Sequence, residues 1–364
     1  LPLALVAALL MAAMGGCVPQ EATPSDAPSG AEVGAPYRIG FLAAITGSAS
    51  FLGEPERDAA VMLQEQLDAL GGVVGPDGVR HPVQLLIHDT QGSGDVAITL
   101  AKKLIDDEGV VAIVGTTVSP VAMALVPVIQ EAQVPLVSMA SSSAIVEPVA
   151  ERYWIFKTAQ NNAHTAPSQV RYAKALGVSR IANFYVNNAY GEDGAIAIRA
   201  AAQAEGLQIV LEETFDAADT DMTAQLTKLR ASDAEALLVT AIPPAAAILT
   251  KQYREMGLEL PLIHNHGIGM RPFIDLAGDA AEGVVFPLGK VIAAEYLPDD
   301  DPQKPVLQQF IANYEAAQGN PGAHFAGHAW DAVQLVVAAL EALPDGLSLQ
   351  DQRARVRDGI EATQ

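Results

Sequence analysis

The chain has 364 residues, of which 50% are hydrophobic and 5% aromatic. Because one hydrophobic core rarely organises so many residues, two lobes are expected. The net charge of −22, from 43 acidic and 21 basic residues, argues strongly against nucleic acid as a partner, since phosphates require clustered Lys and Arg.

The N-terminal segment predicts export. Residues 1–14 are apolar but short for a membrane span, and Gly-Gly-Cys follows at 15–17. This sequence resembles a bacterial lipobox, in which cleavage leaves Cys17 as the lipidated first residue; the alternative is an ordinary signal peptide with an incidental cysteine. We therefore expect a lipoprotein signal peptide at 1–17 and, from its Pro, Ser, Gly and Ala content, a flexible linker at 18–36. The absence of an initiator Met and a basic n-region predicts that the sequence starts late.

From Tyr37 onward, strand and helix patterns alternate. The runs RIGFLAAI, VQLLIHD, VVAIVG and PLVSMAS predict buried strands, and helical spacing of apolar residues over 56–70 predicts a helix after the first of them. Buried strands separated by helices are typical of a parallel sheet with helices on both faces.

The pattern then restarts. After YWIFKT, read as an extended link, the runs RIANFYV, LQIVLEE, ALLVTAI and PLIHN predict a second set of strands, and 303–361 is mostly helical. The predicted fold is α/β, with two Rossmann-like lobes and a cleft between them. Lobe 1 is expected at 37–154 plus 289–364, and lobe 2 at 155–288. Ligands of such sheets bind beyond the carboxyl ends of the strands.

Two predicted strand ends carry hydroxyl side chains. Thr117 and Ser119 follow one strand, where Ser119 is expected as a helix N-cap before Pro120, so that the free N–H groups of that helix end suit a carboxylate. The alternative is that Ser119 only caps its own helix. Ser141 and Ser142 belong to a run of three serines after the next strand, which supplies uncharged donors or forms a simple polar turn.

The third strand end is His264-Asn265-His266. Alternation places His264 and His266 on one face of the strand. A zinc site needs three or four ligands, the other five histidines show no ligand spacing, and Cys17 is the only cysteine, so no metal is expected. His266 is then either a structural or a pocket histidine. The chain lacks a complete G-x-G-x-x-G, a Walker A loop, a G-x-S-x-G elbow and H-E-x-x-H, so neither an enzyme nor a cofactor is expected.

Several segments resemble one family. IGFLAAITGSASFLGEPERDAA, HDTQGSGDVAITLAKKLI, VVAIVGTTVSP, VPLVSMASSSA, YGEDGA and LAGDAAEG are similar, in order, to type I periplasmic solute-binding proteins of ABC importers, in the branched-chain amino-acid-binding group. The similarity runs from Arg38 to about Pro344. FKTAQNN, TDMTAQLTKLRA, IHNHGIGMRPFIDLAGDAAEGVVFPLGK and HFAGHAWDA most resemble the subgroup that takes up aromatic acids such as hydroxycinnamates. Relative to the family, the chain also stops early, which predicts a fragment.

The resemblance implies ligand contacts. Family ligands bind between the lobes, with a carboxylate held at the positions of Ser119 and of Ser141 and Ser142. The tyrosine of the YG motif corresponds to Tyr190. Positions that often carry ligand-stacking aromatics in the family are Leu52 and the segment at Ile242.

His266 departs from the family pattern. Amino-acid binders have an acidic residue there to pair with the ligand's ammonium, and histidine gives no full counter-charge to a cation; it donates instead to a carboxylate or phenol. The chain is therefore expected to be an exported, lipid-anchored, monomeric component of an ABC importer that delivers a small carboxylate, preferably an aromatic acid, to permease subunits in the membrane. The alternatives are a branched-chain or other neutral amino acid as ligand, or an extracellular sensor domain.

Overall fold

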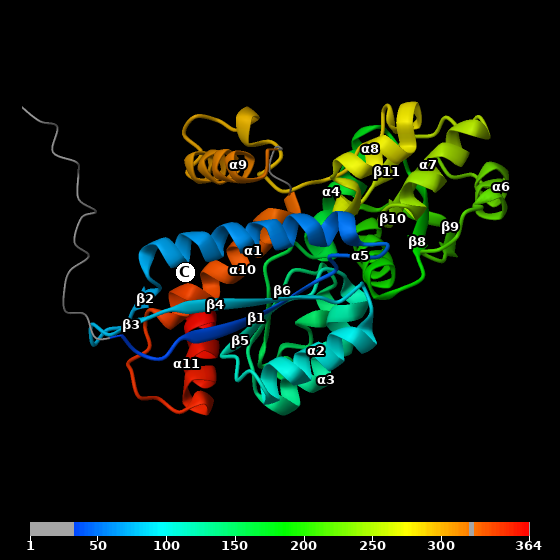
Figure 1. Ribbon diagram of the computed structural model, residues 1–364. Helices are drawn as coiled ribbons and strands as arrows, with labels where there is room; N and C mark the ends of the chain where they lie inside the picture. Colours follow the sequence, from blue (N-terminus) through cyan, green and yellow to red (C-terminus); the bar gives the residue numbers. More distant parts are fainter. Residues whose placement is uncertain (1–32, 320–323, 364) are drawn as a thin grey trace, which may run out of the picture.

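The computed structural model describes residues 33–319 and 324–363, which form two α/β lobes (Figure 1). The predicted signal peptide with Cys17, and the linker up to residue 32, lie outside the described residues. Both sheets are parallel and carry helices on their two faces, so the predicted fold class is confirmed.

The first lobe contains a five-stranded sheet in the order β4-β1-β5-β6-β7. Its strands read as short apolar runs because both of their faces are covered. They are β1 (Tyr37–Ala43), β4 (Val83–Asp89), β5 (Ala112–Gly115), β6 (Leu136–Ser138) and β7 (Ile155–Lys157). A small antiparallel pair, β2 (Val73–Val74) and β3 (Arg80–His81), precedes β4.

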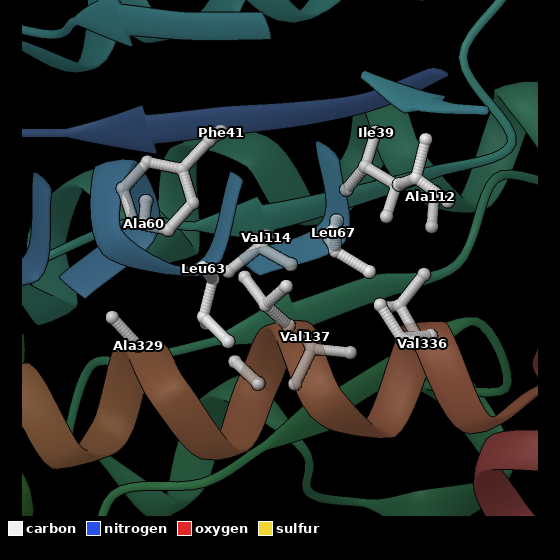
Figure 2. Close-up of a cluster of buried hydrophobic side chains, with 14 of the residues drawn as sticks. Ile39, Phe41, Ala60, Leu63, Leu67, Ala112, Val114, Val137, Ala329 and Val336 are labelled. Carbon is white, nitrogen blue, oxygen red and sulfur yellow. The ribbon is translucent and has the colours of Figure 1, made fainter. Parts of the chain in front are cut away.

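One face of this sheet is covered by helices from both ends of the chain. α1 (Ser50–Leu70) lies beside α10 (His324–Leu340) in Figure 1. Figure 2 shows Leu63 and Leu67 of α1 and Val336 of α10 gathered with the strand residues Val114 and Val137. α9 (Lys304–Gln318) and α11 (Leu349–Ala362) extend this core, and α2 (Gly94–Asp106) with α3 (Ser119–Ala132) covers the opposite face.

The second lobe has a four-stranded sheet in the order β11-β10-β8-β9. Its strands are β8 (Arg180–Val186), β9 (Gln208–Phe215), β10 (Ala236–Thr240) and β11 (Leu262–His264). One face is covered by α4 (Asn162–Ala175) and α5 (Ala189–Glu205). The other is covered by α6 (Thr223–Ala231), α7 (Ala245–Glu255) and α8 (Arg271–Ala277).

A glycine in the first turn of a helix has the same role in each lobe. A Cβ added to Gly53 in α1 would lie 2.2 Å from the carbonyl oxygen of Ala44, and one added to Gly191 in α5 would lie 1.9 Å from that of Val186. Only glycine permits such close backbone approach. The two helix N-termini therefore sit directly on the carboxyl ends of β1 and β8, at the side where the lobes meet.

Three details differ from the sequence predictions. α1 begins at Ser50, six residues before the predicted helix, in a segment whose Gly53 and Pro55 are poor helix formers. β7, predicted as part of an interlobe link, pairs in register with β6, so residues 155–157 extend the first sheet and the chain leaves that lobe after Lys157. The last linker residues are ordered against the first lobe, since Val33 forms a β-bridge with Arg80.

Two connections between the lobes lie in the part of the chain that the structure describes. Residues 158–161 lead from β7 to α4, and the chain returns after Val285, which bridges to Ile263, through a segment that ends at α9. Within the described ranges, no helix is both long and apolar enough to cross a membrane.

Candidate functional site

A cavity of about 200 Å³ lies where the two lobes meet. It is smaller than the roughly 300–1,000 Å³ of pockets that hold drug-sized ligands, so it suits a small solute. Both lobes and α10 contribute to its wall, which is mostly apolar. The residues that line it are Ser48, Ala49, Leu52, Gly92, Thr117, Val118, Ser119, Pro120, Met139, Ser141, Ala159, Asn188, Tyr190, Ala217, Ile242, His266, Gly267, Phe325 and His328.

In the part of the chain that the structure describes, three α-helices have their N-cap residue in the wall of this cavity. Their N-cap residues are Ala49 for α1, Val118 for α3 and Asn188 for α5, and all three line the wall. Asn188 caps its own helix by accepting hydrogen bonds from Tyr190 N and Gly191 N, whereas no side chain caps α1 or α3. The positive ends of these helix dipoles favour an anion in the cavity.

Ser119 is the first residue of α3 rather than its N-cap, so the predicted capping role is wrong. Val118 occupies the cap position, and the Ser119 hydroxyl instead accepts a hydrogen bond from Ser142 N at 3.1 Å. The first turn of α3 is thereby tied to the end of β6. Ser142 does not line the cavity; its own hydroxyl accepts from Ala144 N, and its N–H holds the hydroxyl of Ser119.

Thr117 lines the cavity, but its hydroxyl is engaged elsewhere. It accepts a hydrogen bond from Ala44 N at 2.8 Å and donates to Glu56 Oε2 at 2.6 Å. Glu56 is 0% exposed. Burial raises the pKa of Glu56 well above its usual value, and the hydrogen bond from Thr117 opposes that shift. Thr117 therefore fixes the strand ends against α1.

His266 lines the cavity from the second lobe and contacts the first. Its Nε2 lies 2.8 Å from Ser141 Oγ, and Ser141 also donates to the carbonyl of Gln160 at 2.8 Å. His266 is 3% exposed, and burial together with the positive charge of His324 and Lys157 lowers the pKa of His266 to about 3. The surroundings of His266 therefore hold its imidazole neutral at physiological pH.

Tyr190 lines the cavity beside His266, with the two rings edge to face at a centroid distance of 5.7 Å. Its hydroxyl is buried and makes no hydrogen bond within the usual distance and angle limits, although the backbone of Gly267 lies against it. A Cβ at Gly267 would come 2.7 Å from this oxygen. Burial raises the pKa of Tyr190, so the group is neutral, and its O–H has no acceptor among the residues that the structure describes.

The apolar wall joins residues far apart in the sequence. Leu52 belongs to a small buried cluster with Ala44 and Ala49, against which Ile242 of the second lobe and Phe325 of α10 pack. The predicted residues Leu52 and Ile242 thus face each other across the lobes, as members of one cluster and of the cavity wall.

Phe325 and His328 were missed as site residues. The spacing of His324 and His328, four apart in α10, puts both on one helix face, and this spacing is a signal that the sequence contains. Their Nε2 atoms lie 3.3 Å apart, and His324 Nε2 is 3.0 Å from Gln160 Nε2. Among the residues that the structure describes, no group of three or more His, Cys, Asp or Glu side chains could hold a metal ion.

The other histidine of the opening motif serves a different part of the fold. β11 ends at His264, and Asn265 is the N-cap of the short 3₁₀ helix η3 (His266–Ile268), so strand alternation does not continue and the predicted shared face is wrong. His264 Nε2 lies 3.0 Å from Thr250 Oγ1 of α7, in the core. Only His266 reaches the cavity.

Comparisons with known proteins agree with this architecture. The family described as periplasmic binding protein matches residues 36–364. A leucine-, isoleucine-, valine-, threonine- and alanine-binding protein of Pseudomonas aeruginosa is 24% identical over 307 residues, which cover 84% of this chain and 78% of that protein. The Leu/Ile/Val-binding protein homolog 8 of Brucella suis is 26% identical, over 79% of this chain and 71% of its own.

Solved structures are similar over nearly the whole chain. An extracellular ligand-binding receptor from Rhodopseudomonas palustris superimposes with a TM-score of 0.81 at 28% identity, and covers 90% of this chain and 89% of its own. A branched-chain amino acid transporter substrate-binding protein from Streptococcus pneumoniae, solved with isoleucine, has a TM-score of 0.76 at 23% identity and covers 89% and 87%. The second likeness concerns the fold alone.

Proposed function

The chain belongs to the periplasmic binding protein family, and we propose that it is the substrate-binding component of an ABC importer that captures a small carboxylate, in particular an aromatic acid, between its lobes. Closure of the lobes would then present the ligand to a membrane permease. The curated relatives are named as amino-acid-binding proteins, which supports binding rather than catalysis.

The observation that carries the ligand class is the charge of the cavity wall. None of its lining residues within the described ranges is Asp, Glu, Lys or Arg. A ligand ammonium would be buried beside neutral His266 without a counter-charge, and an unpaired buried charge costs several kcal/mol. A carboxylate instead meets the uncapped N-termini of α1 and α3 and the hydroxyl of Ser119.

The remaining wall favours an apolar body on that carboxylate. Leu52, Met139, Ile242 and Phe325 line the cavity, and burying apolar ligand surface against them is favourable by roughly 25 cal/mol per Å². The unpartnered hydroxyl of Tyr190 supplies one further donor for a ligand oxygen. We propose Leu52, Thr117, Ser119, Ser141, Tyr190, Ile242 and His266 as the residues around the ligand, with Ser142 supporting them from behind.

The second candidate ligand is a branched-chain amino acid, which the names of the curated relatives favour. The two ligand classes differ in the ammonium group, so calorimetry of 4-hydroxycinnamate, benzoate and leucine on the same protein separates them. We expect both aromatic acids to bind at least a hundredfold more tightly than leucine. Benzamide, the uncharged counterpart of benzoate, should bind weakly because it lacks the anion. Tighter binding of leucine would overturn the proposed ligand class.

We also propose export to the periplasm or the outer face of the cytoplasmic membrane, with a lipid on Cys17. The apolar run at 1–14 followed by Gly-Gly-Cys supports this proposal. Mass spectrometry of the protein expressed from its full-length gene should find Cys17 as a lipid-modified first residue. An unmodified Cys17, or cleavage at another position, would contradict it.

A further inference from the structure

A continuous chain of polar contacts runs through His266 from one lobe to the other. On one side of the ring, Nδ1 lies 2.5 Å from Asn265 Oδ1. On the other side, Nε2 lies 2.8 Å from Ser141 Oγ, which in turn lies 2.8 Å from the carbonyl oxygen of Gln160. Three contacts therefore link four groups, and each contact needs one proton to be a hydrogen bond.

The orientation of the Asn265 amide fixes where these protons must be. Its Oδ1 accepts from His266 N at 2.6 Å and from Thr165 Oγ1 at 2.9 Å, and its Nδ2 donates to Asn162 Oδ1 at 2.8 Å. Turning the amide over would direct its NH₂ group at a backbone N–H. Asn265 Oδ1 is thus an acceptor toward the ring, so the proton between them must come from His266 Nδ1.

The three contacts have one proton too few when the imidazole is neutral. A neutral imidazole contributes one N–H and Ser141 contributes one O–H, which makes two protons for three contacts. If His266 Nδ1 donates to Asn265, the Ser141 hydroxyl faces two acceptors, His266 Nε2 and Gln160 O. An imidazolium, with a proton on each ring nitrogen, turns all three contacts into hydrogen bonds.

The charged and titratable groups around His266 explain why its imidazole lacks this proton. Lys157 of β7 donates to the carbonyls of Ser141 and Ala159, at 2.9 and 2.8 Å, and His324 and His328 of α10 adjoin the same site. Burial, followed by the charges of His324 and Lys157, lowers the pKa of His266. These neighbours are basic.

The two carboxylates of this region act on Lys157 rather than on His266. Asp193 of α5 accepts from Ser143 N at 3.1 Å and from Asn162 Nδ2 at 2.7 Å, and both Asp193 and Glu147 act on Lys157. Tyr190 beside the ring is neutral. An anion inside the cavity would therefore supply the negative charge that the surroundings of His266 lack.

We propose that His266 binds a proton when a carboxylate enters the cavity, so that the ligand and one proton are captured together. This inference rests on the proposed carboxylate ligand. The bound anion faces an imidazolium whose two N–H groups are held by Asn265 and Ser141, and the same proton completes the hydrogen-bonded link between the lobes. Ligand capture and lobe closure are thus joined through one group.

The proposal fixes the direction of the pH dependence. Because the complex binds the proton more strongly than the empty protein does, ligand affinity increases as the pH falls. His266 has one pKa in the ligand-free protein and a higher one in the complex. Between these two values, the Kd for benzoate should decrease tenfold for each unit by which the pH falls. Above the pKa in the complex, the dependence should disappear.

Calorimetry of benzoate at pH 6 in MES and in bis-tris, buffers that differ in ionisation enthalpy, measures the protons taken up on binding. At this pH benzoate is ionised and Lys157, with a pKa lowered by burial to about 8, already carries its proton. We expect an uptake of about one proton, and a value near zero for His266→Gln. Asp331→Asn is the matched control, because burial raises the pKa of Asp331 to about 6 in the same helix as His328 and yet Asp331 does not line the cavity.

The outcomes separate the two proposals. Benzoate binding with no proton uptake would overturn this inference and leave the proposed function intact. Absence of binding by every aromatic acid would overturn both. Uptake that survives in His266→Gln but is lost in His328→Gln would also refute the assignment to His266. If His266→Gln fails to fold, ¹H–¹⁵N correlation spectra of the wild-type histidine rings decide: the complex should show one imidazole with protons on both nitrogens, and only neutral rings would refute the proposal.

Discussion

The substitution His266→Glu should reverse the charge preference of the cavity. In the wild-type protein His266 borders the cavity as a neutral or protonated ring, whereas the variant places a carboxylate at the same wall, beside Ser141. Two negative charges about 5 Å apart repel by roughly 3 kcal/mol at an effective dielectric constant near 20. Since each 1.4 kcal/mol is about a factor of ten, benzoate should lose affinity by a few hundredfold. His266→Gln adds no negative charge, so its loss of benzoate affinity should be smaller than that of His266→Glu.

Titration calorimetry at pH 7.5 with benzoate and leucine checks this reasoning. The Glu variant should also gain affinity for leucine, because its carboxylate can pair with the ligand's ammonium. Circular dichroism melting of both variants controls for loss of folding. Unchanged benzoate affinity in a folded His266→Glu protein would show that this side chain does not face the ligand, and would refute the proposed site.

Three further predictions concern groups around the cavity. Thr117→Val should lower the free energy of unfolding by about 1–3 kcal/mol, since it removes the hydrogen-bond partner of Ala44 N and of Glu56 Oε2. Thr117→Ser keeps the hydroxyl and should keep most of this stability, and urea titrations of both variants measure the difference. Glu56→Gln should remove a pH dependence of the free energy of unfolding. Because the folded-state pKa of Glu56 is raised, its contribution to stability is fully present below the unfolded pKa of about 4.5 and is lost as the pH rises through the folded value. Urea titrations from pH 4 to 8 should therefore show a free energy of unfolding that falls with pH in the wild type and not in the variant. Tyr190→Phe should raise the melting temperature of the ligand-free protein or leave it unchanged, because the O–H has no acceptor among the described residues. The same substitution should weaken 4-hydroxycinnamate binding, and unchanged binding would mean that the hydroxyl does not reach the ligand.

The sequence predicted the two sheets well because their strands are buried on both faces. Apolar runs such as ALLVTAI at 236–242 leave little choice but a covered strand, and β10 is buried along its whole length. Strand ends then predicted which residues would gather: Thr117, Ser119, Ser141 and His266 all line one cavity.

The failures arise where tertiary contacts decide a side chain's partner. The sequence around Ser119 predicts an N-cap, yet the neighbouring strand end offers Ser142 N, and the hydroxyl turns to it. The hydroxyl of Thr117 is fixed by Glu56, which lies 61 residues away and has no local signal. Phe325 and His328 reach the cavity only because α10 returns to the first lobe, and periodicity within α10 cannot show which cavity its face meets.

The interrupted course of the first lobe sets an order of folding during synthesis. The second sheet and its helices come from one continuous segment that ends by Ala277. The first lobe begins earlier, but the face with the apolar residues Phe41, Val114 and Val137 is only partly covered, by α1, until α10 has been made; α10 ends 63 residues after Ala277. The second lobe can therefore be completed first. During that interval the part of the sheet face that α10 will cover stays exposed, and the chain is then most prone to aggregation and to chaperone binding.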